Sequence, residues 1–321
     1  PAFIENEFKR NQNNAIQGAI NAKKNAGYLA STAYRQLLQA DNIAAISSQG
    51  TEQSLKNVTL ADVKAFYKQQ VKPTNSQLIV VSDLKEKALV KSLNVFSTWQ
   101  GKGESLELAL AKPDTKAGVI YLVNKDGAAQ SAIRIGRRAL KHDVTGQYYK
   151  AQLMNFPLGG VFNSRLNLNL REDKGYTYGA RSGFNGNRLA GFFTAKAAVR
   201  ADVTDKSIVE FVNEINDYAT KGITNDELAF MRQSINQRDA LKYETPGAKL
   251  QFLAQILEYD LTPSFVKEQA DIVESITLAE VNALAKTYLN IEDMLMVVVG
   301  NSKVLKPQLE ALGYQVIDYS L

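Results

Sequence analysis

One arginine and one tyrosine stand out as a pair of side chains that could act on a carbonyl group. Arg171 ends a short predicted helix, and Tyr178 lies seven residues later, on the strand that follows a turn at Gly175. Such a turn can bring a guanidinium and a phenol to one side of a domain, where both can donate hydrogen bonds to a peptide carbonyl and to its oxyanion. The alternative is structural: Arg171 pairs with Glu172 or Asp173, and Tyr178 packs in the sheet. Spacing alone favours this structural alternative.

Two glycines come shortly before the helix that Arg171 ends. They belong to a distinctive run, which reads Leu158-Gly159-Gly160-Val161-Phe162-Asn163-Ser164-Arg165-Leu166. Glycine permits backbone conformations with positive φ and close approach by another chain. Gly159 and Gly160 are therefore candidates for a loop that another chain approaches closely.

The composition indicates a globular protein and excludes several kinds of site. The 321 residues correspond to two domains at about 150 residues each. The chain has no cysteine, which excludes disulfides and thiolate metal sites. It has one histidine, His142, whereas a catalytic zinc takes about three ligands drawn mainly from His, Glu and Cys. We therefore expect no zinc in this chain, and Ser-His-Asp or Cys-His catalysis is poorly supported for the same reason.

Charge and hydropathy limit the partners. The 38 basic and 33 acidic residues leave a net charge of +5, and no long basic run occurs, so a nucleic-acid partner is not expected. No apolar stretch approaches the roughly 20 residues of a membrane span.

The chain contains an internal repeat. Val58–Val63 recurs as Ile276–Val281, and Leu78–Val81 recurs as Met296–Val299, each pair 218 positions apart (276 − 58 and 296 − 78). Segments that keep register in this way indicate a duplicated domain.

The two copies differ in length. We expect residues 105–321 to form a complete domain and residues 1–104 to form only the second half of one. The segment Lys102–Lys116 is rich in charged and small residues and is interpreted as the linker between them. The missing first half of copy one is expected to lie upstream of Pro1.

Each copy of the repeat opens a helix with a capping box. Thr59 precedes Asp62 by three residues, and Thr277 precedes Glu280 by three, so hydroxyl and carboxylate can satisfy free N–H groups of the first turn. Each helix leads through a polar turn into a predicted strand, Gln77–Val81 in the first copy and residues 294–299 in the second.

The other predicted elements complete an α+β pattern. Helices are expected over Phe3–Ala22 and Tyr28–Leu38, separated at Gly27. In the second domain the predicted strands are 118–123, 131–137, 176–183 and 191–199, and the predicted helices are 146–156, 163–171, 205–220, 226–243 and 247–259. This mixture indicates an α+β sandwich, with helices on one face of a mostly antiparallel sheet.

These motifs together resemble the pitrilysin/insulinase zinc metallopeptidases, the inverzincins. The resemblance rests on the Gly-Gly-x-Phe-x-Ser-Arg-Leu run, the Leu-Arg-Glu-x-x-Gly-x-x-Tyr run and the duplicated domain, and it covers essentially the whole chain. It implies duplicated pitrilysin-type (metallohydrolase-like) α/β sandwich domains, with the first copy truncated to its second half.

The resemblance also implies a role for the arginine and tyrosine. In that family an H-x-x-E-H motif and a downstream glutamate bind zinc. A different domain contributes an Arg and a Tyr, seven residues apart, that bind the substrate carbonyl and stabilise the transition state. Arg171 and Tyr178 match this motif and its spacing. The resemblance thus assigns them catalytic roles, and it assigns Gly159 and Gly160 to substrate binding beside them.

The departures from the family pattern concern the metal. No H-x-x-E-H motif occurs in the chain, and the downstream ligand would fall near Gln17, where no acid is present. A glutamine cannot replace an anionic zinc ligand well. The resemblance therefore implies that this chain binds no cofactor itself and that zinc is held by a partner domain or subunit that carries H-x-x-E-H.

Two functions stay open at this point. In the first, the chain is the non-zinc-binding half of a zinc metalloendopeptidase, which is inactive alone and acts on peptides with its partner, in cis or in trans. In the second, it is a catalytically silent scaffold or assembly subunit of the same fold. A dimer is possible in either case, and an extracytoplasmic bacterial location fits the lack of cysteine and the family's habits.

Overall fold

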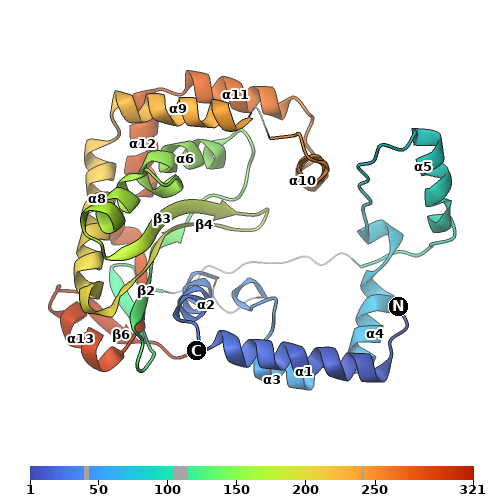
Figure 1. Cartoon of the computed structure of the whole chain (residues 1–321), viewed down its shortest axis with the longest axis horizontal. Coiled ribbons are helices and arrows are strands. Elements are labelled where there is room, and N and C mark those ends of the chain that lie inside the picture. Colours follow the sequence, from blue (N-terminus) through green and yellow to red (C-terminus); the bar gives the residue numbers. More distant parts are fainter. Residues whose placement is uncertain (40–42, 105–114, 240–241) are drawn as a thin grey trace. The chain divides into compact units, whose positions relative to one another are not determined.

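The computed structural model describes residues 1–39, 43–104, 115–239 and 242–321 (Figure 1). The chain forms two compact units. Unit 1 comprises Pro1–Ile20, Gln49–Ala109 and Gln237–Pro263, and unit 2 comprises Asn21–Ser48, Leu110–Asn236 and Ser264–Leu321. Most of the predicted linker, residues 105–114, lies outside the described residues.

Among the described residues, helices alone occupy the chain before the first strand, and helices and strands are mixed after it. The α-helices are α1 (Glu5–Ala22), α2 (Ala26–Gln39), α3 (Glu52–Asn57), α4 (Leu60–Gln70), α5 (Glu86–Leu93), α6 (Gln147–Asn155), α7 (Arg165–Asn167), α8 (Thr204–Lys221), α9 (Asn225–Asp239), α10 (Pro246–Tyr259), α11 (Phe265–Ser275), α12 (Leu278–Tyr288) and α13 (Ser302–Glu310). The strands are β1 (Val119–Asn124), β2 (Gln130–Arg138), β3 (Thr177–Gly186), β4 (Gly191–Arg200), β5 (Leu295–Gly300) and β6 (Gln315–Asp318).

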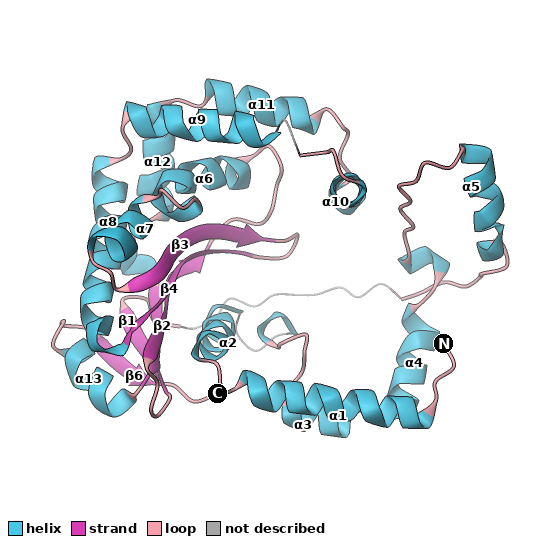
Figure 2. Ribbon diagram, in the orientation of Figure 1, coloured by secondary structure: helices cyan, strands magenta, loops and turns pink. Residues whose placement is uncertain are grey.

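All six of these strands form one sheet in unit 2, in the order β3-β4-β2-β5-β1-β6 (Figure 2). The pairs β3–β4, β4–β2 and β2–β5 are antiparallel, whereas β1 runs parallel to β5 and β6. Strand β5 is buried at every position, as expected for a central strand covered on both faces. The predicted α+β class with a mostly antiparallel sheet is confirmed.

The two faces of the sheet carry separate cores. Alternate residues such as Ile133 and Val298 face a large core built with α6, α8, α9, α11, α12 and α13. The intervening residues, such as Val297 and Ala132, face a smaller core built with α2 (Figure 1). Helices were predicted on one face only; α2 covers part of the second face because β1 and β5 are apolar on both sides.

A tyrosine fixes α2 to the sheet. The buried Tyr34 hydroxyl donates a 2.6 Å hydrogen bond to the Phe193 carbonyl of β4. A side chain at Gly136 of β2 would place its Cβ 2.2 Å from that hydroxyl and 2.0 Å from the Phe193 carbonyl oxygen. The absence of a side chain at Gly136 is what allows the tyrosine to reach the backbone of β4.

The compact units cut across the division predicted at residue 104. Residues 21–48, which include α2, belong to unit 2, and residues 237–263 belong to unit 1. Compact units are defined by contacts, whereas the predicted domains 1–104 and 105–321 are copies of a repeat. The repeat boundary therefore stays a prediction.

The local elements predicted for the two copies of the repeat form only in part. The capping box at Thr59 forms, and so does its counterpart at Thr277 in unit 2. The break between α1 and α2 falls at residues 23–25, and Gly27 lies inside α2, so the predicted break at Gly27 is wrong.

The predicted strand Gln77–Val81 pairs with no strand in the described residues, and Leu78 is 59% exposed. A strand needs neighbours to satisfy its backbone groups, whereas its repeat counterpart β5 has one on each side.

Candidate functional site

The candidate residues lie on one continuous segment of unit 2. Helix α6 runs into a π-helical turn, η4 (Phe156–Gly160), which contains both candidate glycines. The short helix α7 then runs into a second π-helical turn, η5 (Leu168–Asp173), which contains Arg171, and β3 follows. Single π-helical turns are rare in proteins, and those that occur are often found at functional sites.

Arg171 is held by two neighbours. Its guanidinium carbon lies 4.5 Å from the centre of the Phe162 ring. Its Nε lies 3.3 Å from a carboxylate oxygen of Glu172, so one ion pair of the structural alternative forms. A guanidinium carries five N–H donors, so these contacts orient Arg171 and leave donors for a ligand.

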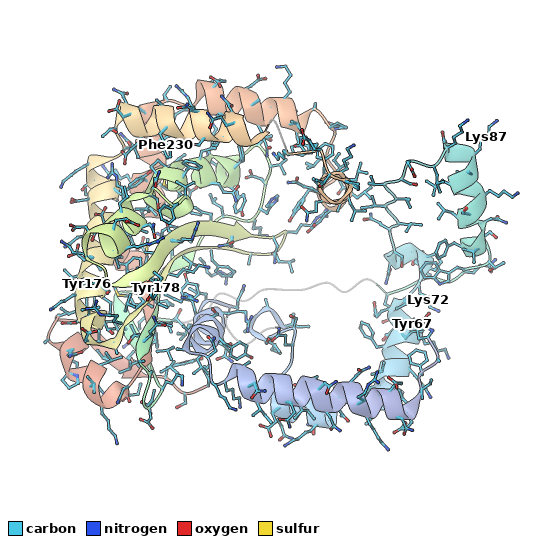
Figure 3. The ribbon with its side chains drawn as sticks, in the orientation of Figure 1. Tyr67, Lys72, Lys87, Tyr176, Tyr178 and Phe230 are labelled. Carbon is cyan, nitrogen blue, oxygen red and sulfur yellow. The ribbon has the colours of Figure 1, made fainter. Side chains whose placement is uncertain are left out.

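Tyr178 is 88% exposed at the start of β3 (Figure 3). Its side chain makes no hydrogen bond with any described residue, so it does not pack in the sheet as the structural alternative required. Thr177 pairs with Val199 and Ala180 pairs with Ala197, so the register with β4 shifts across Tyr178. Such a bulge interrupts the ladder and re-aims the side chain at the extra residue. The phenol is therefore available to a ligand.

Two buried asparagines tie this segment to β3, one just before the candidate glycines and one between them and Arg171. Asn155 donates a 2.9 Å hydrogen bond to the Ser182 carbonyl and accepts one of 2.6 Å from the Ser182 hydroxyl. Asn167 accepts a 3.1 Å hydrogen bond from the Ala180 backbone N–H. The loop is thus fixed to the strand that carries Tyr178.

The two candidate glycines have different environments. Gly159 is buried, and a Cβ there would lie 2.2 Å from the Ser182 hydroxyl oxygen and 2.3 Å from its backbone nitrogen. Gly160 is exposed, and a Cβ there would lie no closer than 3.3 Å to its nearest neighbour, the Asn155 carbonyl oxygen. Neither glycine has a positive φ. The close approach predicted for Gly159 is made by β3 of the same chain, and substrate binding by either glycine stays a prediction.

Arg165, within the same sequence run, has a structural role. It makes two hydrogen bonds of 2.6 Å to the carboxylate of Glu227 and one of 2.9 Å to the Gly222 carbonyl. Its guanidinium also lies 4.9 Å from the centre of the Tyr218 ring. Burial raises the pKa of Glu227, but the hydrogen bonds from Arg165 and Thr224 outweigh burial and hold that pKa below its ordinary value.

We expect Glu227→Gln to destabilise the protein by about 2–3 kcal/mol at pH 7, because it leaves a half-buried guanidinium without its charge partner. The lowered pKa of Glu227 means that the carboxylate contributes stability above its ordinary pKa of 4.5, and loses it as pH falls through the folded-state pKa. Urea denaturation between pH 7 and pH 3 checks both points. Wild type should lose stability relative to the variant as the pH falls below about 4.5.

Asp202→Asn is the matched control, because the Arg200–Asp202 pair is exposed. No measurable change is expected for it at pH 7. An equal loss in both variants would contradict the structural role assigned to Arg165 and Glu227.

No group of three or more His, Asp or Glu side chains that could hold a metal ion occurs among the described residues. His142 instead lies against Tyr148, with the two ring centres 4.9 Å apart. Gln17, at the position where the resemblance places a zinc ligand, is exposed on α1. In the described ranges no helix is both long and apolar enough to cross a membrane.

Sequence reasoning missed three residues that position the candidate pair. Phe162 orients Arg171, and Asn155 and Asn167 fix the loop to β3. Phe162 is an aromatic residue within a glycine-rich run. That position could have indicated that its ring packs against a functional side chain rather than in the core. Nothing in the sequence distinguishes the two asparagines from ordinary helix-end residues.

Two curated bacterial proteins are similar in sequence to this chain. The chain is 23% identical over 305 residues to "Non-peptidase homolog YmxG" of Helicobacter pylori, covering 94% of this chain and 70% of that protein. It is 22% identical over 203 residues to "Uncharacterized zinc protease YmxG" of Bacillus subtilis, covering 63% of this chain and 48% of that protein.

A solved structure also matches closely. The crystal structure of a peptidase M16 inactive domain from Pseudomonas fluorescens superposes with a TM-score of 0.83 at 25% identity, over 94% of this chain and 71% of that one. The family description "Peptidase M16 inactive domain" matches residues 57–235, more than half of the sequence. The resemblance to the pitrilysin/insulinase peptidases is thereby confirmed, and the chain belongs to the peptidase M16 inactive domain family.

Proposed function

We propose that this chain is the substrate-binding half of a zinc metalloendopeptidase, and that Arg171 and Tyr178 act at a zinc site on another domain or subunit. The observation that carries the proposal is the state of Tyr178. Its phenol is exposed at a bulge and has no hydrogen-bond partner among the described residues, and it lies seven residues after an arginine that its neighbours hold in place. The inactive-domain family fits a chain that holds no zinc of its own.

Each side chain has a separate task in the proposed reaction. The Tyr178 hydroxyl donates a hydrogen bond to the oxygen of the scissile carbonyl, and this bond strengthens as the oxygen becomes an anion. The Arg171 guanidinium binds an adjacent carbonyl and supplies a fixed positive charge. The attacking water would be activated by zinc held on the partner. Peptides are the substrates, and the partner carries the H-x-x-E-H motif.

A silent scaffold is the second candidate, and the printed name of the Helicobacter pylori relative, a non-peptidase homolog, favours it. In that case the chain only assembles partners. Arg171 and Tyr178 then contribute nothing to turnover, and substitutions of either leave cleavage unchanged.

We expect Arg171→Ala to lower kcat/KM of the enzyme assembled with its zinc-binding half about 100-fold, because a fixed donor to the substrate is lost. Arg171→Lys should recover only part of this loss, since lysine keeps the charge but not the planar fork of donors. Chelator-sensitive cleavage of a quenched fluorogenic peptide measures all three proteins.

Arg10→Ala is the matched control, because Arg10 is also a helical arginine paired with a nearby acid, Glu7. Its kcat/KM should stay within about twofold of wild type. Equal activity of wild type and Arg171→Ala would favour the scaffold.

A further inference from the structure

Three cationic side chains form a row across strands β3, β4 and β2. In the strand register, Arg181 of β3 lies directly opposite Lys196 of β4, and Lys196 lies directly opposite Arg134 of β2. No ion pair joins any of the three to an acidic side chain in the described part of the chain. Like charges directly opposite one another destabilise a sheet. The cationic row therefore lowers the stability of the folded protein. This indicates that the three residues serve a purpose other than folding.

The row lines a cavity of about 360 Å³, a size typical of ligand sites. The cavity lies entirely within unit 2, on the face of the sheet that carries the smaller core, and Ser31 and Tyr34 of α2 line it together with residues of β2, β3 and β4. Ser31 and Thr194 add hydroxyl groups to its wall, and no carboxylate lines it. The remaining wall includes backbone without side chains, at Gly159, Gly160 and Gly183.

Arg134 is fixed in place and still has donors to offer. One of its terminal nitrogens donates a 2.9 Å hydrogen bond to the Ile133 carbonyl, and the other donates one of 3.2 Å to the Ser31 hydroxyl on α2. A guanidinium has five N–H groups, and these two hydrogen bonds leave other N–H groups of Arg134 for a ligand.

The electrostatics of the cluster favour the binding of an anion. Burial, and then the charges of Arg134 and Arg181, hold the pKa of Lys196 below its ordinary value. Burial also lowers the pKa of Arg134. A bound anion would oppose both effects, because a negative charge nearby favours the charged form of a base.

We propose that this cavity binds a carboxylate group of a peptide, either the C-terminal carboxylate or an acidic side chain. Two guanidinium groups and an ammonium group offer the donor geometry that carboxylates accept. The glycine wall leaves room for a peptide backbone beside the charge. Peptide as the ligand class rests on the proposed function, whereas the cavity itself includes neither Arg171 nor Tyr178.

The peptide is expected to lie over the sheet face rather than to join the sheet at this point. Strand β3 is at the edge of the sheet, but Asn167 already bonds the Ala180 N–H and Asn155 already bonds the Ser182 carbonyl. A covered edge does not accept a further strand. Recognition at the cavity therefore depends on charge.

The test is direct binding of short fluorescent peptides to the intact chain, measured by anisotropy at constant salt. One peptide has a free C-terminus and no acidic side chain, the second is the same peptide amidated, and the third is amidated with one internal Glu. At least one of the two carboxylate-bearing peptides should bind about tenfold or more tightly than the neutral amidated peptide. The better of the two identifies the source of the carboxylate. Equal affinity for all three overturns the proposal.

Variants locate the binding. Arg181→Gln and Lys196→Gln should each reduce the affinity of the preferred peptide about tenfold. Neither should lower Tm, because each relieves like-charge repulsion. Lys221→Gln, which removes an exposed lysine at the end of α8, is the matched control and should bind as wild type does. Unchanged peptide affinity in both Arg181→Gln and Lys196→Gln overturns the assignment to this cavity.

A phosphate arm separates this proposal from its main competitor. Inorganic phosphate that binds in an Arg181-dependent way, with no peptide binding, overturns the peptide carboxylate in favour of phosphate. Neither Arg171 nor Tyr178 lines the cavity, and the binding assay on the intact chain requires no cleavage. Failure of those two side chains in catalysis therefore leaves the cavity intact, and failure of the cavity leaves the catalytic proposal intact.

Discussion

Replacing Tyr178 by phenylalanine is expected to lower kcat of the assembled peptidase about 100- to 1,000-fold, because one donor to the developing oxyanion is lost. The substitution removes a single oxygen atom from a side chain that is 88% exposed and makes no hydrogen bond within the described residues. The free energy of unfolding should therefore not change. KM should change far less than kcat, since the bond is strongest in the transition state.

Tyr176→Phe is the control for this experiment. Tyr176 lies two residues earlier, and the backbone around it bonds to Leu170 and Arg200. Its phenol has no assigned role, so kcat should stay within about twofold of wild type. An equal fall in both variants, or a fall that affects KM alone, would contradict oxyanion stabilisation by Tyr178.

Gly159→Ala is expected to destabilise the protein by about 2–4 kcal/mol, because overpacking a buried contact forces the backbone apart. The new Cβ would lie 2.2 Å from the Ser182 hydroxyl oxygen and 2.3 Å from its nitrogen. Moving η4 away from β3 would also strain the two hydrogen bonds between Asn155 and Ser182. Urea denaturation measures the loss.

Gly160→Ala separates this structural role from substrate binding. Gly160 is exposed, and its Cβ would meet the Asn155 carbonyl oxygen at 3.3 Å, so we expect a change within about 0.5 kcal/mol. Reduced peptide affinity in Gly160→Ala at unchanged stability would support the predicted role of this glycine. Equal stability of both variants and wild type would contradict the tight packing of η4 on β3.

The elements that local signals specify were predictable. Thr277 and Glu280 form the predicted capping box, and the apolar run of β5 is a central strand. The same signals occur at Thr59 and in Gln77–Val81, where the capping box forms but the strand does not. A cap is satisfied within four residues, whereas a strand depends on neighbours that the local pattern cannot supply.

The candidate site was predictable only in its residue types. The roles that the motif assigns to Arg171 and Tyr178 stay a prediction, and the Arg171–Glu172 ion pair was foreseen only as part of the structural alternative. The ring of Phe162 beneath the guanidinium and the bulge at Tyr178 depend on tertiary packing.

The cationic row was equally hidden from the sequence. Its members come from β2, β3 and β4, far apart in the chain, and only the strand register shows that they are neighbours. A shift of one residue in any of these strands would send its cation to the opposite face.

Complementation between two halves tests the central claim most directly. This chain, a zinc-binding M16 partner with an intact H-x-x-E-H motif, and an equimolar mixture of the two are each assayed for chelator-sensitive cleavage of one fluorogenic peptide. Cleavage by the mixture, with neither half active alone, is the result that the proposed function predicts. Cleavage by the partner at the same rate with and without this chain would contradict it.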